Sequence, residues 1–140
     1  MVTSDRVVVH VDGGARGNPG PAAVAAVATD ADGNTLAERN AYIGEATNNV
    51  AEYRAVLLAL ELARELGARD VEVVNDSELV ARQIGGEYKV KNAALLELFV
   101  ETMRRLREEF DSWRVRNVRR EHNVRADELV NEALDEAARA

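Results

Sequence analysis

Four carboxylates in this 140-residue chain stand where strands are expected to end or helices to begin. Asp12 follows the apolar run VVVHV and Asp76 follows VEVVN, whereas Glu52 and Asp127 fall in the first turns of predicted helices. In α/β sheets these termini can gather at one edge, the usual place for a site. Carboxylates gathered there repel one another, and divalent cations relieve that repulsion. Two such ions can activate a water and stabilise the leaving oxygen in phosphodiester cleavage, so the set indicates metal-dependent phosphodiester chemistry.

Each of these carboxylates also has an ordinary structural explanation. Asp12 is a common turn former after a strand, and Asp76 is a common N-cap. Glu52 fits a capping box, NVAE, in which it would bond the amide of Asn49. It also lies on the core-facing stripe of its helix, where an uncompensated carboxylate is costly. Asp127 suits the helix dipole in a first turn. The hypothesis of a shared site therefore depends on the four positions taken together.

The segment DGGARGNPGPAA, residues 12–23, contains four Gly and two Pro. It has neither a Walker A sequence nor the dinucleotide-binding pattern G-x-G-x-x-G. It predicts a tight turn with bare backbone amides, such as that of Gly13, that approach the sugars and phosphates of a polymer. The alternative is a Gly-Pro connector between two strands. Arg16, in the middle of the segment, either contacts substrate or faces solvent.

Two further groups of polar residues accompany the carboxylates. Three small polar side chains stand at a predicted helix N-terminus: Thr47, Asn48 and Asn49. They form either a favourable anion site or an ordinary capping cluster. His122 lies five residues before Asp127 and is either a proton relay or a surface histidine.

The elements that must position these residues follow an α/β order. Apolar periodicity and turn residues predict strands at Val7–Val11, Thr35–Ile43, Val71–Val74 and Trp113–Val118, and helices at Asn49–Leu66, Ser77–Ile84, Asn92–Phe110 and Val124–Ala138. Residues Val24–Thr29 are compatible with either a helix or a strand. The order indicates one domain in which helices cover a mixed sheet.

Composition excludes several classes of protein. The absence of Cys excludes disulfides, thiolate chemistry and Cys-ligated zinc. No apolar stretch suits a signal peptide or a membrane span, so we expect a cytoplasmic protein without a membrane partner. The net charge is −7, yet residues 104–125 hold eight Arg against four acidic residues. That segment either meets a phosphate backbone or forms a solvated helix face.

Four motifs together resemble type 1 ribonuclease H: VDGGARGNPGPAA, TNNVAEY, NDSELV and REHNVRADELVNEAL, in that order and at similar spacing. The resemblance spans nearly the whole chain. It implies a single ribonuclease H domain over residues 1–140, expected to be a monomer. The implied fold is α/β, the ribonuclease H-like fold, with a five-stranded mixed sheet in the order 3-2-1-4-5 flanked by helices. Residues Val24–Thr29 would be its second strand.

The same resemblance implies an endonuclease that hydrolyses the RNA strand of RNA–DNA hybrids. Two Mg²⁺ or Mn²⁺ ions would serve the reaction, which would leave 5′-phosphate and 3′-hydroxyl ends. Asp12 would touch both ions, and Glu52 would be a ligand that also meets the RNA 2′-hydroxyl. Asp76 would orient one metal and the attacking water, and Asp127 would hold the second ion. The 2′-hydroxyl, which only RNA carries, would set the choice of strand.

Substrate-binding residues follow from the same motifs. Asn18 matches a contact to the substrate backbone, and Thr47 and Asn48 match residues that bind the DNA strand. We add Gly13, Asn49 and Arg120 to the expected substrate-binding set, Arg120 as a candidate for phosphate contact.

The chain departs from the family in three places. Asn75 stands where a small residue such as Ser, Thr or Gly is common, which should not disturb Asp76. The basic handle of some members is missing, as in the handle-less archaeal and bacterial-like forms, so Lys89, Lys91 and the arginine segment are candidates to supply binding. His122 does not clearly match the mobile-loop histidine of other members, although it remains a candidate catalytic residue.

Other functions compatible with the sequence are a broader nuclease that also cuts double-stranded RNA and a non-catalytic hybrid-binding module. The four carboxylates argue against the second, because a binding module does not need them. A phosphatase or nucleotide-binding domain lacks a phosphate-loop Lys or nucleophile motif here. Members of the family also occur as nuclease domains of larger polyproteins, which is a further alternative for this chain.

Overall fold

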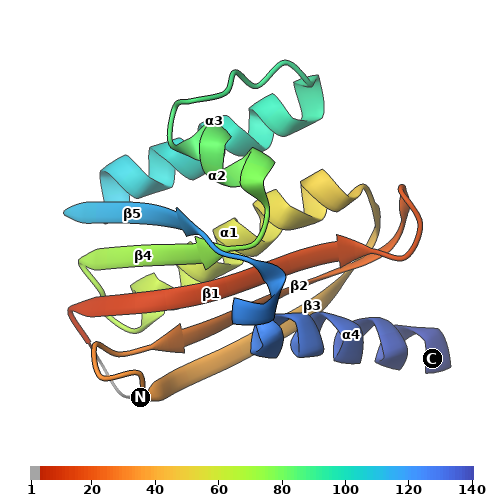
Figure 1. Cartoon of the computed structure of the whole chain (residues 1–140), viewed down its shortest axis with the longest axis horizontal. Helices are drawn as coiled ribbons and strands as arrows, with labels where there is room; N and C mark the ends of the chain where they lie inside the picture. Colours follow the sequence, from red (N-terminus) through yellow and green to blue (C-terminus); the bar gives the residue numbers. More distant parts are fainter. Residues whose placement is uncertain (1–3) are drawn as a thin grey trace.

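A five-stranded sheet in the order β3-β2-β1-β4-β5 forms the centre of the structure (Figure 1). The structure is a computed structural model that describes residues 4–140. The β1–β2 and β2–β3 pairs are antiparallel, whereas β1–β4 and β4–β5 are parallel. The predicted fold class and strand order are therefore confirmed. The elements are β1 (Arg6–Ala15), β2 (Gly20–Thr29), β3 (Thr35–Ala46), α1 (Asn48–Glu65), β4 (Asp70–Asn75), α2 (Glu78–Ile84), α3 (Ala93–Glu109), β5 (Ser112–Asn117), the 3-10 turn η1 (Arg120–His122) and α4 (Val124–Arg139).

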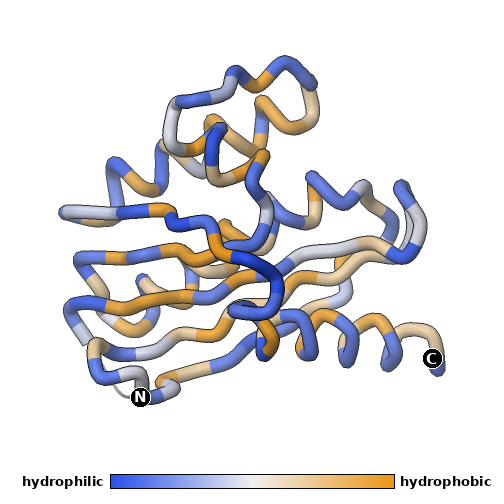
Figure 2. The backbone as a smooth tube through the Cα atoms, in the orientation of Figure 1, coloured by the Kyte–Doolittle hydropathy of each residue, from blue (hydrophilic) through white to orange (hydrophobic). Residues whose placement is uncertain are grey.

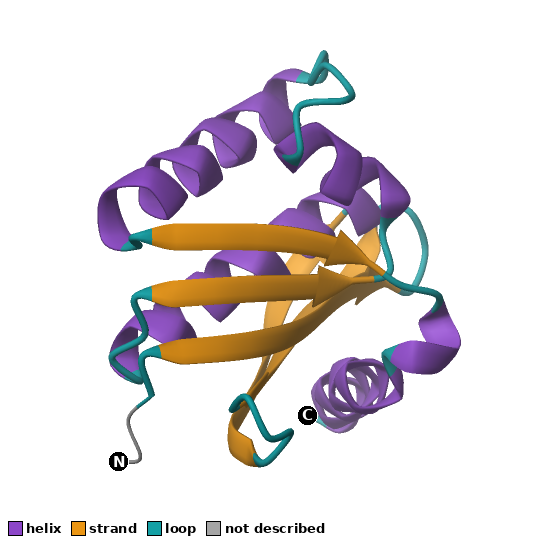
Figure 3. Ribbon diagram, turned by 60° about the vertical axis from the view of Figure 1, so that its left-hand side comes forward, coloured by secondary structure: helices purple, strands orange, loops and turns teal. Residues whose placement is uncertain are grey.

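Helices cover the sheet on both faces. Helices α1, α2 and α3 lie on one face, and α4 crosses the other face (Figure 3). The larger apolar cluster lies between α1, α3 and the sheet, and a smaller one joins α4 to β2. Apolar residues accordingly concentrate along the central strands (Figure 2). Within residues 4–140, none of the helices has the length and apolar character needed to cross a membrane.

Strand β2 resolves the ambiguous segment Val24–Thr29 as a strand. Ala25 packs toward α4 and Ala26 packs toward α1, and both are fully buried. Alanine has a weak intrinsic preference for strands, but two helices press on this strand from opposite faces. Small side chains therefore allow close packing on both sides, and tertiary packing overrides the local preference.

Strand β1 extends four residues beyond its predicted end, through Ala15. Its parallel pairing with β4 ends at His10, whereas its antiparallel pairing with β2 continues to Ala15. Asp12 therefore lies inside a strand, two residues past the last pair with β4, and the prediction that it ends the strand is wrong. The site begins where β1 is no longer paired with β4.

Candidate active site

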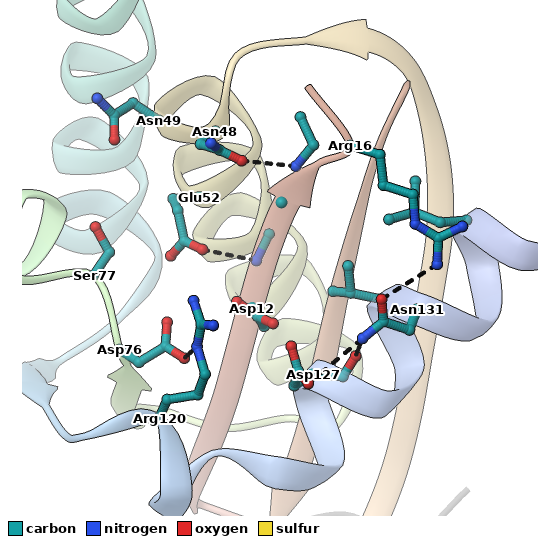
Figure 4. Close-up of a pocket in the computed structure, with 15 residues that line it drawn as sticks. Asp12, Arg16, Asn48, Asn49, Glu52, Asp76, Ser77, Arg120, Asp127 and Asn131 are labelled. Carbon is teal, nitrogen blue, oxygen red and sulfur yellow. Dashed lines mark hydrogen bonds and ion pairs between the residues drawn. The ribbon is translucent and has the colours of Figure 1, made fainter. Parts of the chain in front are cut away.

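The four carboxylates line one cavity of about 390 Å³ at the carboxyl ends of β1 and β4 (Figure 4). Asp12, Glu52 and Asp76 each offer an oxygen that lies within 4.8 Å of the others. Asp127 approaches Asp12 from the first turn of α4 (Figure 4). The structure thus brings together all four residues that the sequence singled out, from β1, the residue that follows β4, and two helices.

Glu52 is held by β1 rather than by its own helix. Its Oε1 accepts a hydrogen bond of 3.0 Å from the backbone N–H of Gly13. The capping box with Asn49 is wrong, because Thr47 is the N-cap and its hydroxyl accepts from the Val50 amide at 3.2 Å. Within residues 4–140, Glu52 Oε2 is buried without a hydrogen-bond partner.

Helix α1 approaches β1 closely at this point. A Cβ on Gly13 would stand 2.2 Å from the carbonyl oxygen of Ala51, a distance that no side chain tolerates. Glycine at position 13 therefore lets the first turn of α1 reach the strand, and that contact brings Glu52 beside Asp12.

Asp76 is also free of a capping role. The N-cap of α2 is Ser77, whose hydroxyl accepts from the Val80 amide at 3.4 Å. Asp76 Oδ2 is buried and has no hydrogen-bond partner among the described residues, and the Arg120 Nε lies 4.0 Å from it. The side chain of Arg120 is 83% exposed and reaches over the cavity from η1 (Figure 4).

Asn123 fixes the start of α4 and was not singled out from the sequence. Its side chain is almost fully buried and donates from Nδ2 to the carbonyl of Val11 at 2.7 Å. Asn123 occupies the N-cap position of α4 but makes no side-chain cap. The bond instead ties η1 and α4 to β1, one residue before Asp12. An Asn directly before a predicted helix was the available signal, although it favours a cap.

Burial and mutual repulsion perturb the titration of this cluster. Burial, and then the charge of Asp76, raise the pKa of Asp12 to about 7. Burial and the neighbouring Asp12 raise the pKa of Glu52 well above its ordinary value. Burial also raises the pKa of Asp76, and Arg120 partly opposes that rise. Such shifts are expected where acidic groups converge without a cation between them.

Hydrogen-bond donors border the cavity at the N-terminus of α1. The Asn48 Oδ1 accepts from the Ala15 amide at 2.8 Å, and the Asn18 Oδ1 accepts from the Asn48 amide at 3.1 Å. Because both oxygens are used internally, the amide NH₂ groups of Asn18 and Asn48 remain as donors. Asn49 lines the same edge.

The glycine-rich segment is a connector between strands, with a loop at residues 16–19. Three of its amides are hydrogen-bonded within the protein. Gly13 donates to Glu52, Ala15 donates to Asn48, and Arg16 donates to the Pro21 carbonyl. These three amides are therefore not available to a substrate, whereas an approach of the substrate backbone to the rest of the segment stays a prediction; Gly13 lines the cavity.

His122 lies outside the residues that line the carboxylate cavity. It is exposed and lines a second cavity of about 270 Å³ together with His10 and Asn123. The structure therefore places no histidine around the carboxylates within the cavity lining. A relay role for His122 stays a prediction.

The arginine segment, residues 104–125, does not form one basic surface. Arg104 pairs with acidic residues on α3, and Arg116 pairs with Glu72 on the sheet. Of this segment, Arg120 alone lines the carboxylate cavity in the described structure. Most of the segment is thus an ion-paired, solvated surface.

The segment that replaces the missing handle is a short loop between α2 and α3. Lys89 and Lys91 are both exposed there, and neither forms an ion pair within residues 4–140. Gln83 Nε2 lies 3.5 Å from the Lys89 carbonyl, and its Oε1 accepts a 2.5 Å hydrogen bond from the buried Tyr53 hydroxyl. The loop is therefore connected to α1, the helix that carries Glu52.

The sheet order and the carboxylate edge define a domain with the ribonuclease H-like fold. A family model described as reverse transcriptase-like matches residues 10–133. A ribonuclease HI of Halobacterium salinarum is 46% identical over 132 residues, which is 94% of this chain and 66% of that relative. A bifunctional protein of Mycobacterium tuberculosis is 46% identical over 136 residues, which is 96% of this chain. The chain spans only 37% of the length of that relative.

Solved structures agree closely. The crystal structure of RNase H1 from Halobacterium salinarum has a TM-score of 0.91 and 45% identity, covering 94% of this chain and 98% of that one. The LC11-RNase H1, solved in complex with an RNA/DNA hybrid, has a TM-score of 0.91 and 49% identity, covering 94% and 99%. This chain therefore belongs to the type 1 ribonuclease H family.

Proposed function

We propose that this chain is an endonuclease that hydrolyses the RNA strand of RNA–DNA hybrids. The observation that carries the proposal is the cluster of Asp12, Glu52 and Asp76, whose oxygens converge within 4.8 Å at the cavity. A relative that is 49% identical was solved with an RNA/DNA hybrid, which supports the same substrate here.

The carboxylate cluster fits divalent cations. All of its donors are oxygens, the ligands that Mg²⁺ and Mn²⁺ prefer. Glu52 Oε2 and Asp76 Oδ2 are buried without a hydrogen-bond partner among the described residues, as expected for atoms reserved for a ligand. We propose that Asp12, Glu52, Asp76 and Asp127 hold two Mg²⁺ or Mn²⁺ ions. When bound, the ions would activate a water and stabilise the oxygen that departs from the phosphate. The cleavage would produce 5′-phosphate and 3′-hydroxyl ends.

The residues around the cluster bind and orient the substrate. Asn18 and Asn48 offer their amide NH₂ groups, and Thr47 offers its hydroxyl, beside the N-terminus of α1. Donors at a helix N-terminus suit phosphate oxygens, so this edge would hold the DNA strand, with Asn49 beside it. Gly13 lines the cavity beside this edge, where its backbone would lie next to the substrate.

The RNA strand would lie over the carboxylates. Glu52 Oε2 is an acceptor without a partner in the described structure, so it can accept from a 2′-hydroxyl, which DNA lacks. Arg120 is exposed beside Asp76 and would contact a phosphate of the strand being cut. These two groups would select RNA and align its backbone.

The test is cleavage of end-labelled RNA–DNA hybrid, double-stranded RNA and double-stranded DNA in Mg²⁺ or Mn²⁺. Wild type should cut the hybrid within its RNA strand. Asp12→Asn and Asp76→Asn should lose activity by at least about a hundredfold, because each removes a charged ligand. Failure of wild type to cut the hybrid, from low to molar salt, would refute the enzyme. Undiminished cleavage by both variants would refute the site. Cleavage of double-stranded RNA in the same assay shows whether the activity extends beyond RNA–DNA hybrids.

A further inference from the structure

Arg16 extends from the loop between β1 and β2 to α4 at the rim of the carboxylate cavity (Figure 4). Its Nη2 donates to Asp135 Oδ1 at 2.7 Å and to Asn131 Oδ1 at 3.3 Å. The Arg16 side chain is exposed, yet its guanidinium is hydrogen-bonded within the protein. It is held by two residues of α4.

Asn131 connects this arginine to the fourth carboxylate. Its Nδ2 donates to the backbone carbonyl of Asp127 at 3.1 Å and lies 3.5 Å from Asp127 Oδ2. Asp127, Asn131 and Asp135 are spaced four residues apart, so they form one line along α4.

The chemistry of arginine decides how Asn131 is oriented. A guanidinium has only donors, so it fixes the amide oxygen of Asn131 on its own side. The NH₂ group must then point toward Asp127, where it is a donor to the carboxylate. The reversed amide would set an oxygen against that carboxylate and an NH₂ against the guanidinium. Asp135, which accepts from the same Nη2, holds Arg16 in place for this purpose.

We propose that Arg16 and Asn131 are positioning residues that orient the Asp127 carboxylate toward Asp12 for cation binding. This inference rests on the proposed function, because it gives Asp127 the role of a ligand. Residues that orient a metal ligand typically alter metal affinity or activity by about 10–100-fold when removed.

Arg125 provides a matched control. It also connects α4 to the sheet, since its guanidinium donates to both oxygens of Glu38 on β3, at 2.8 and 2.9 Å. It does not line the carboxylate cavity. Arg125→Ala therefore removes an anchor of α4 without touching Asp127.

The experiment compares Arg16→Ala, Asn131→Ala and Arg125→Ala by calorimetric titration of the substrate-free protein with Mn²⁺, and by hybrid cleavage over a range of Mg²⁺ concentrations. We expect the first two to weaken Mn²⁺ binding and to raise the Mg²⁺ concentration for half-maximal activity, each by about tenfold. KM for the hybrid at saturating Mg²⁺ should stay within about twofold. Arg16→Ala combined with Asn131→Ala should cost little more than either alone, because both act in one chain of bonds.

A second set of variants separates orientation from loss of folding. Asn131→Leu keeps a side chain of similar size but removes both the acceptor for Arg16 and the donor to Asp127, so it should behave like Asn131→Ala. Thermal unfolding of every variant shows whether it is folded at the assay temperature. Arg125→Ala should lower the melting temperature while its Mn²⁺ affinity stays within about twofold of wild type.

Two results would overturn the inference. One is Mn²⁺ binding by Arg16→Ala and Asn131→Ala that equals that of Arg125→Ala. The other is a rise in KM with unchanged metal dependence, which would make Arg16 a substrate contact. Asp127→Asn in the same assays tests the role of Asp127 as a cation ligand, on which the inference rests. If it keeps full activity and Mn²⁺ affinity, the proposed function of Asp127 fails. If it loses both while the Arg16 and Asn131 variants do not, only the positioning inference fails.

Discussion

The backbone N–H of Gly13 donates a 3.0 Å hydrogen bond to Glu52 Oε1, so the residue after Asp12 holds the second carboxylate of the cluster. The bond crosses from β1 to the N-terminal part of α1 and satisfies one oxygen of a buried acid. The other oxygen has no partner among the described residues. One short contact therefore both stabilises the burial of Glu52 and directs it into the cavity.

Gly13→Ala should separate α1 from β1. Its new Cβ would meet the Ala51 carbonyl at 2.2 Å, so the helix must shift and the bond to Glu52 must lengthen. We expect a loss of about 1–3 kcal/mol in the free energy of unfolding, as for other overpacked sites, with loss of most hybrid cleavage. Gly14→Ala is the control, because a Cβ there meets nothing within 4 Å. Denaturant titration would contradict the close-approach argument if the two variants were equally stable.

Stability of the metal-free protein should depend on Asp12 protonation. The folded-state pKa of about 7 exceeds the ordinary value of 3.8, so folded protein keeps a proton that unfolded chains have lost between these values. The stability that this proton contributes to the folded protein is complete below the pKa of Asp12 in the unfolded chain. It disappears as the pH rises through the pKa of Asp12 in the folded protein. With chelator present, the free energy of unfolding of the wild type should fall by about 1–3 kcal/mol from about pH 5 to about pH 8, and Asp12→Asn should abolish that fall.

The readout is melting temperature against pH, for wild type, Asp12→Asn and the exposed turn variant Asp32→Asn. Mg²⁺ should raise the wild-type melting temperature most at high pH, where the carboxylates are charged. Wild type and Asp12→Asn profiles that run parallel from pH 5 to pH 8 would contradict the proposed repulsion.

Asn48→Asp should weaken hybrid binding with little effect on the fold. An aspartate retains the oxygen that accepts from the Ala15 amide at 2.8 Å, but it replaces the outward NH₂ donor with a negative charge. We expect KM for the hybrid to rise by about tenfold or more, since a donor to phosphate becomes a repelling group. Fluorescence anisotropy with labelled hybrid in Ca²⁺ measures binding alone. Unchanged affinity would place the DNA strand elsewhere.

Arg120→Ala should reduce the dependence of hybrid binding on salt. Each lost phosphate contact lowers the slope of log affinity against log salt by about 0.7–0.9. Arg104→Ala is the control, because Arg104 is engaged with Glu101 and Glu108 on α3. Equal slopes for wild type and Arg120→Ala would mean that the exposed guanidinium serves only to moderate the charge of Asp76.

His122→Ala should change kcat by no more than about threefold. The side chain lines the second cavity rather than the carboxylate cavity. A general acid or base normally contributes about 10²–10⁴-fold, so a loss of that size, with an altered pH–rate profile, would show that His122 moves to the reacting groups during turnover.

The element order was predictable because apolar periodicity and turn residues are local signals. The grouping of Asp12, Glu52, Asp76 and Asp127 was predictable because strand ends and helix starts share an edge in α/β sheets. The extent of β1 was not, since a Gly- and Pro-rich segment reads as a turn, and its strand conformation depends on pairing with β2.

The connections that hold the site were beyond the reach of local signals. Gly13 and Glu52 are 39 residues apart, and Arg16 and Asn131 are 115 residues apart. Neither pair follows from capping or spacing rules, which favoured Asn49 as the partner of Glu52 and solvent or substrate as the partner of Arg16. Sequence patterns therefore identified the carboxylates that gather at the cavity, whereas long-range packing determines how their side chains are oriented.

The loop between α2 and α3 has a practical consequence. It carries the only two lysines of the chain, Lys89 and Lys91, both exposed, while every other cationic side chain apart from the histidines is an arginine. An amine-directed dye would thus attach at this loop and at the terminal amine, leaving the carboxylate cluster unmodified. A fluorophore can therefore be attached at this loop. Gln83 and Tyr53 connect the loop to α1, the helix that bears Glu52.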